Sequence, residues 1–86
     1  MKSLQPLDIV ANIAPIPTER LTLLDESCAS IQIFPAGQVG TILEVYGGET
    51  LNYLVEFSDS QGREYAMAIL RKSEVLALKY DLVLAA

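Results

Sequence analysis

Histidine is absent from this sequence of 86 residues, and cysteine occurs once, at Cys28. Without histidine, the chain has no imidazole metal ligand, no imidazole acid or base, and no nucleophile activated by histidine. A single cysteine excludes a disulfide within the chain and is typical of a reducing compartment. We therefore predict a cytoplasmic, non-catalytic protein with no cofactor and no metal.

Basic residues are also few. Six lysines and arginines stand against eleven aspartates and glutamates, which gives a net charge of -5. Proteins that bind nucleic acids gain much of their affinity by neutralising phosphates with clustered basic residues. The only adjacent basic pair in this chain is Arg71-Lys72. The charge balance argues against nucleic acids as the main ligand, and equally against anionic membrane surfaces.

Long apolar runs are missing as well. No stretch reaches the roughly 18 apolar residues of a membrane-spanning helix, and Pro6 and Asp8 interrupt what would be a signal-peptide core. The apolar share is nevertheless high, at 51%, in a length suited to a single domain over residues 1–86. Because so small a domain has little interior, we expect exposed apolar surface that contacts a partner protein or another copy of the chain.

Short alternating segments separated by turn residues predict a mainly β protein of five to six strands. In segment 51–57 the residues Leu51, Tyr53, Val55 and Phe57 share one face, and Leu54 lies on the other. The expected strands are 7–13, 31–34, 38–46, 51–57 and 64–70. Segment 73–78 is either a strand or one helical turn, and residues 72–74 suit the short 3-10 turn that often precedes the last strand of a small barrel.

Two details of this pattern concern turns and burial. Gly40 inside strand 38–46 predicts a bulge or a close backbone approach, and Gly62 in turn 58–62 is available for a positive φ. Strand 64–70 is apolar on both faces, which predicts a strand that is buried on both sides or that covers an interface.

Two regions do not follow the strand pattern. Segment 15–34 is interpreted as an insertion that begins with an extended, proline-rich path and then forms a helical turn or an ordered loop. Thr18 is predicted to cap that turn, with Leu21 and Leu24 on one helical face. The tail 79–86 is apolar, and it forms either a final strand or a contact with a neighbour.

Four stretches of the sequence resemble those of a known family. The longest of them is Gly37-Gln38-Val39-Gly40-Thr41-Ile42, followed by Glu44-Val45-Tyr46. These stretches resemble an uncharacterised bacterial family of small proteins that has no established activity. The resemblance implies an SH3-like barrel, a fold also similar to the nitrile hydratase β subunit barrel and to KOW modules. It does not cover 15–34 or the chain after Leu78. The other matching stretches are Asp8 to Ala11, Tyr53 to Phe57 and Gly62 to Leu70.

Two carboxylates and the cysteine are candidates for catalysis. Glu44 and Glu56 lie on adjacent expected strands, but general acid–base chemistry needs such groups in a cleft with shifted pKa values. We interpret them as solvated residues on the outside of a sheet. Cys28 follows Asp25 and Glu26, whose charges would raise the pKa of its thiol, and it has no base partner. We therefore interpret it as a small, half-buried apolar residue.

Four tyrosines are candidates for stacking on nucleobases, but the chain has too few basic residues to accompany them. Tyr53 and Tyr65 are predicted to line the core, with their hydroxyls at its edge, and Tyr46 is predicted to contact a partner. The predicted partner-binding residues are Tyr46, Leu54, Tyr80, Leu82 and Leu84.

Three functions follow, in order of preference. The first is a non-catalytic interaction or regulatory module, such as the small acidic partner of a protein encoded by a neighbouring gene, because an acidic binder is suited to covering a basic site. The second is a KOW-like nucleic-acid-binding barrel, proposed by analogy alone. The third is an accessory subunit of an enzyme.

Overall fold

The computed structural model describes residues 4–24 and 33–78 of the chain. Within these residues the protein is all-β, which confirms the predicted fold class. The described residues contain eight strands rather than five or six, because segment 15–34 contributes two unpredicted short strands in addition to the one expected at 31–34. The elements are β1 (Ile9–Asn12), β2 (Ile16–Pro17), η1 (Thr18–Arg20), β3 (Leu21–Leu23), β4 (Ile33–Phe34), β5 (Val39–Tyr46), β6 (Asn52–Ser58), β7 (Glu64–Arg71), η3 (Lys72–Glu74) and β8 (Val75–Ala77).

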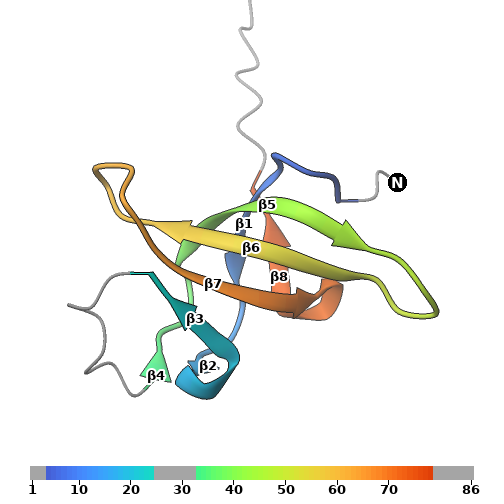
Figure 1. Ribbon diagram of the computed structural model, residues 1–86, viewed down its shortest axis with the longest axis horizontal. Coiled ribbons are helices and arrows are strands. Elements are labelled where there is room, and N and C mark those ends of the chain that lie inside the picture. The colour runs from blue at the N-terminus through green and yellow to red at the C-terminus, as the bar shows by residue number, and fades with distance from the viewer. Residues whose placement is uncertain (1–3, 25–32, 79–86) are drawn as a thin grey trace, which may run out of the picture.

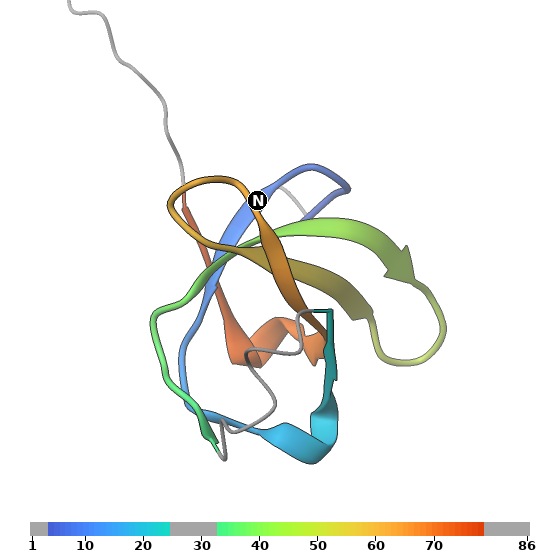
Figure 2. The same cartoon turned by 60° about the vertical axis from the view of Figure 1, so that its left-hand side comes forward.

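Six of these strands form one antiparallel sheet in the order β3-β7-β6-β5-β1-β8, and β2 pairs with β4 in a separate two-stranded sheet. Strand β7 leads through η3 directly into β8, although the two lie far apart in the sheet order, so the sheet curls (Figure 1). Figure 2 shows the strands curling around a common interior, with β1 and β8 on one side and β3 on the other. The core fills that interior.

Strand β6 lies in the middle of the main sheet and supplies the centre of the core. Tyr53, Val55 and Phe57 are each 0% exposed, as the alternation predicted. Leu51 precedes β6 and is 40% exposed, so it lies outside the core. The rings of Phe34 and Phe57 lie 4.8 Å apart and join β4 to the main sheet. The buried cluster comprises Val10, Ile16, Phe34, Ile42, Tyr53, Val55, Phe57, Ala66, Ala68, Leu70 and Val75.

The prediction for the tyrosine hydroxyls is wrong at Tyr53. Its whole side chain is buried, and its hydroxyl has no hydrogen-bond partner among the described residues. The alternation placed the ring correctly, but β6 is central in the sheet, so the ring does not reach the surface. Tyr65 is half-buried, and its hydroxyl donates a hydrogen bond to Oε1 of Gln38 over 3.4 Å.

Of the two alternatives predicted for strand 64–70, burial on both faces is wrong, and coverage of an interface stays a prediction. Ala66, Ala68 and Leu70 are at most 3% exposed, whereas Ile69, on the opposite face, is 51% exposed. The main sheet is a single curled layer, so one face of β7 meets the core and the other faces outward. The apolar outward positions therefore form surface rather than a second core.

Segment 15–34 is partly helical as predicted, but only over η1. The predicted cap is wrong, because η1 begins after Pro17 and has no side-chain capping hydrogen bond. The helical face predicted for Leu21 and Leu24 is also wrong, because the chain forms β3 there and pairs with β7, with Thr22 opposite Met67. A helical turn this short is unstable alone, and pairing with β7 supplies backbone hydrogen bonds that it lacks.

Gly40 makes the close approach that its place in β5 predicted. A Cβ atom at this position would lie 2.6 Å from Cγ1 of Val55 and 3.0 Å from the carbonyl oxygen of Glu56. The irregularity of β5 lies further along, where its register with β6 shifts between Ile42 and Glu44. Both features let β5 bend within the curled sheet.

The turn before β5 is held by Asn12, a polar side chain that is only 2% exposed. Its amide donates to the carbonyl oxygens of Ala14 and Pro35 over 2.9 and 3.0 Å, and its Oδ1 accepts from the backbone N–H of Gln38 over 2.8 Å. These bonds connect the end of β1 to the start of β5. The motif at 37–41 therefore begins at a fixed position against β1.

The remaining predictions for the end of the chain hold where the structure describes it. The 3-10 turn at 72–74 and the short strand after it are present as η3 and β8. Gly62 has the positive φ expected of it, +78°. The tail 79–86 lies outside the described residues.

Candidate functional site

The side of β5, β6 and β7 that faces away from the core is the main candidate site. In Figure 1 these strands lie in front of β1 and β8, so the viewer looks onto this side. Leu54 on β6 lies directly opposite Ile69 on β7 and Glu44 on β5. We call this surface the outer face, and its side chains are Thr22, Glu44, Tyr46, Asn52, Leu54, Glu56, Met67, Ile69 and Arg71.

Apolar side chains form the centre of the outer face. Leu54 and Met67 are half-buried and Ile69 is 51% exposed, although all three belong to central strands of the sheet. A recess of about 300 Å³ lies over β3, β6 and β7, and it is lined by these three residues together with Arg20, Thr22 and Ala68. The outer face therefore combines an apolar floor with an open hollow beside the rim residue Arg20.

Arg20 forms the rim of this recess and is fixed from two sides. Its guanidinium makes a two-pronged ion pair with Glu74 of η3, with N–O distances of 2.7 and 2.9 Å, and it also donates to the carbonyl oxygen of Ile69 over 3.3 Å. The hydrogen bond from Arg20 lowers the pKa of Glu74 from 4.5 to about 2, and the pair raises the pKa of Arg20. The ion pair joins η1 to η3 and holds the rim in place.

Tyr46 lies on the β5 side of the outer face and is 39% exposed. Its hydroxyl donates a hydrogen bond to Oε2 of Glu44 over 2.7 Å, and this bond raises the pKa of Tyr46. An exposed aromatic ring held in one position by a neighbour offers contact area at low entropic cost.

Of the predicted partner-binding residues, the structure places Tyr46 and Leu54 on the outer face. Tyr80, Leu82 and Leu84 lie outside the described residues. The sequence-based prediction missed Ile69, Met67 and Arg20. The apolar outward positions of strand 64–70 were a usable signal for Ile69 and Met67, whereas nothing in the sequence connects Arg20 with Glu74.

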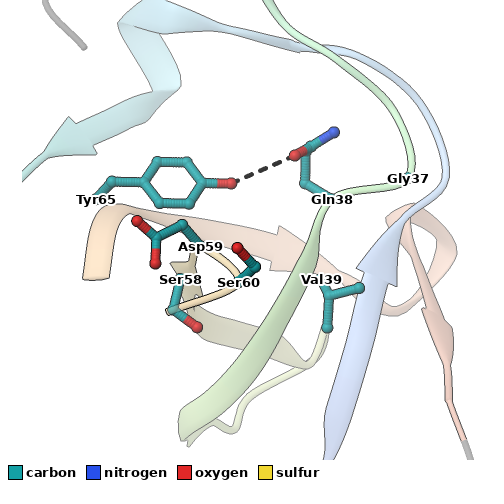
Figure 3. Close-up of a pocket in the computed structure, with 7 residues that line it drawn as sticks. All are labelled: Gly37, Gln38, Val39, Ser58, Asp59, Ser60 and Tyr65. Atoms are coloured by element: carbon teal, nitrogen blue, oxygen red, sulfur yellow. Dashed lines mark hydrogen bonds between the residues drawn. The ribbon is translucent and has the colours of Figure 1, made fainter. Parts of the chain in front are cut away.

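A second, more polar recess of about 590 Å³ lies where the turn after β6 meets the start of β5 (Figure 3). The carboxylate of Asp59 accepts hydrogen bonds from the backbone N–H groups of Gln61 and Arg63 and from Nε of Arg63. These bonds, led by the one from the Arg63 backbone, lower the pKa of Asp59, so its carboxylate supports the turn. The recess is lined by Gly37, Gln38, Val39, Ser58, Asp59, Ser60 and Tyr65.

The fold does not pair the two candidate catalytic carboxylates with each other. Glu44 lies opposite Leu54, and Glu56 lies opposite Thr41, so the two carboxylates are not paired across β5 and β6. Glu44 is exposed and Glu56 half-buried on the outer face, and Cys28 lies outside the described residues. Residues 4–24 and 33–78 contain no cluster of three metal-ligating side chains.

Comparison with known proteins adds a family and no activity. No helix in the described part of the chain is long and apolar enough to cross a membrane. No curated protein and no solved structure matches the chain. Residues 7–77, from the turn before β1 to the end of β8, match the family described as "Domain of unknown function (DUF4926)". The chain therefore belongs to the DUF4926 family.

Proposed function

We propose that this protein is a non-catalytic interaction module and the small acidic partner of a protein encoded by a neighbouring gene. The observation that carries the proposal is the apolar centre of the outer face. Ile69 is 51% exposed beside Leu54 and Met67, in the middle of a sheet whose other face is a packed core. Contiguous apolar surface of this kind is typical of a protein interface.

Charge favours a basic partner. The chain has a net charge of -5, and Glu44 and Glu56 lie beside the apolar centre. Complementary charge at the edge of an interface raises the association rate and selects among partners. A basic surface on a cytoplasmic protein therefore fits the outer face. The curled sheet also suits the SH3-like barrel implied by the resemblance, and we keep that as part of the proposal.

Nucleic acid fits this surface less well. Of the basic side chains in the described residues, Arg20 and Arg63 are paired with Glu74 and Asp59. Arg71 and Lys72 are the other two basic residues in 4–24 and 33–78, and they lie next to each other where β7 ends and η3 begins. Two cations give little of the phosphate neutralisation on which nucleic-acid affinity depends.

Co-expression with the products of the adjacent genes tests the proposal. Each product is purified with this chain by size-exclusion chromatography, once with the parent sequence and once with Ile69→Ser. We expect one product to co-elute with the parent and not with Ile69→Ser. Leu76→Ser is the matched control, because Leu76 is a similarly exposed strand residue, at 57%, on β8.

The control variant should co-elute as the parent does. If no adjacent product co-elutes, or if both variants bind equally well, the proposal is wrong.

A further inference from the structure

The outer face has a charge pattern that is complementary to itself. Across the strands, one row of side chains runs from Arg20 at the rim, through Ile69 and Leu54, to Glu44 on β5. The row therefore reads cation, apolar, apolar, anion. When a second copy of the row faces the first in the reverse order, each cation lies opposite an anion and the apolar residues lie opposite each other.

We propose that the outer face binds a second copy of this chain, through a twofold axis that runs parallel to the strands between β6 and β7. This inference rests on the outer face being the interaction surface named above. The axis sets Leu54 against Ile69 of the partner subunit and Glu44 against Arg20 of the partner subunit. An interface of this kind uses the same patch on both copies, which is the commonest arrangement in homodimers.

Arg20 has the capacity to accept a second carboxylate. Its contacts with Glu74 and with the Ile69 carbonyl use one N–H of Nη1 and both of Nη2. Nε and the other N–H of Nη1 have no acceptor among the described residues, and a guanidinium carries five N–H donors in all. Glu44 of the partner subunit supplies the acceptor.

The neighbouring row is consistent with the same axis. Asn52 on β6 lies opposite Arg71 on β7, so the axis sets each Arg71 against Asn52 of the partner subunit. An amide oxygen accepts from a guanidinium, so this row adds a polar contact at the edge of the apolar centre. An axis across the strands, along the row of Leu54 and Ile69, would instead set Arg20 against Arg20 of the partner subunit and Glu44 against Glu44 of the partner subunit, which like charge disfavours.

The size of the face predicts a weak dimer. Strands β5, β6 and β7, about 4.8 Å apart and rising about 3.3 Å per residue over about seven residues, cover roughly 400 Å² together with the shorter β3. Counted on both copies, that is roughly 800 Å², which is below the size of stable specific interfaces and in the range of weak, transient ones. We expect a dissociation constant on the order of 10 μM. The dimer covers the surface that another protein would use, so a partner protein has to displace the second copy.

Sedimentation velocity between about 1 μM and about 500 μM, a range that spans the expected dissociation constant, tests the dimer. We expect a monomer at the low end and a dimer at the high end. Ile69→Ser should weaken association about thirtyfold, because it removes an apolar contact at the centre of the interface, and Leu76→Ser should leave it unchanged. Circular dichroism and thermal unfolding should show that both variants are folded.

A second pair of variants tests the charge contact. Glu44→Gln should weaken the dimer about fivefold, since it removes one charge opposite Arg20 of the partner subunit. Glu49→Gln makes the same change of net charge in the turn between β5 and β6 and should have no effect. A monomer throughout the concentration range, or a dimer that Ile69→Ser and Leu76→Ser affect equally, overturns the inference.

The experiments can refute the dimer and the proposed function independently of each other. A monomer that loses an adjacent-gene partner through Ile69→Ser refutes the dimer and leaves the function intact. A dimer that Ile69→Ser dissociates, with no adjacent-gene product binding, refutes the function and leaves the dimer intact.

Discussion

The two faces of the β6–β7 pair differ in what their residues do. On the inner face, Tyr53, Val55 and Phe57 pack against Ala66, Ala68 and Leu70, and all six are at most 3% exposed. On the outer face, Leu54, Met67 and Ile69 are also apolar, yet they stay half-buried or exposed. The same strands thus present one apolar face for folding and another for contact. Substitutions on the first should cost stability, and substitutions on the second should cost association.

The largest expected effect contrasts Phe57 with Ile69. Phe57→Ala leaves a cavity in the core and should lower the free energy of unfolding by about 4 kcal/mol. Ile69→Ala removes an outer-face side chain that is 51% exposed and should change the free energy of unfolding by less than about 0.5 kcal/mol. Urea unfolding of the monomer at low protein concentration measures both. Equal losses would mean that the two faces do not have separate roles.

A smaller effect concerns the rim of the outer face. The pKa of Glu74 is lowered from 4.5 to about 2, so its ion pair with Arg20 adds stability above pH 4.5. That stability is lost as the pH falls from about 4.5 to about 2. Because the two side chains are 40% and 30% exposed, we discount the contribution to about 1 kcal/mol.

Urea unfolding at pH 7 and at pH 2.5 measures this contribution. Between pH 7 and pH 2.5 the free energy of unfolding should fall by about 1 kcal/mol less in Glu74→Gln than in the parent protein, because the glutamine amide does not titrate. Asp59, whose pKa is also lowered, titrates alike in both proteins and cancels in the comparison. Identical losses in the two proteins would contradict a stabilising ion pair at the rim.

The smallest effect, of opposite sign, concerns the inner face. The buried hydroxyl of Tyr53 has no hydrogen-bond partner among the described residues. Leaving such a group without a partner costs free energy, so Tyr53→Phe should raise the free energy of unfolding by up to about 1 kcal/mol. Thermal unfolding monitored by circular dichroism detects the change. A loss of stability would show that the hydroxyl has a partner that matters.

The inner face could be predicted from the sequence and the outer face only in part. Period-two alternation in 51–57 placed Tyr53, Val55 and Phe57 in the core, since alternation fixes which residues share a face. The same rule showed that 64–70 is apolar on both sides but not whether a second layer covers it. Whether Ile69 is exposed depends on how many layers pack together, which local sequence does not encode.

Segment 15–34 shows the same limit. Its leucines suit a helical turn or a strand equally, and the pairing of β3 with β7 decides between them. The contact between Arg20 and Glu74 joins residues that are far apart in the chain. No pattern in a single sequence indicates such a pairing. The contact of Gly40 with β6 could be predicted, because a glycine inside a strand indicates by itself a bulge or a close approach of another backbone.

The most direct test of the outer face is a map of the residues that sense association. Amide chemical shifts are recorded at about 10 μM, the expected dissociation constant, where roughly half of the chains are monomers, and at about 1 mM, where nearly all are in the dimer. We predict concentration-dependent shifts along β5, β6, β7 and η1, with the largest near Leu54 and Ile69, and none in β8. Spectra that do not change with concentration, or changes that cluster on β8 and β1, would contradict the account.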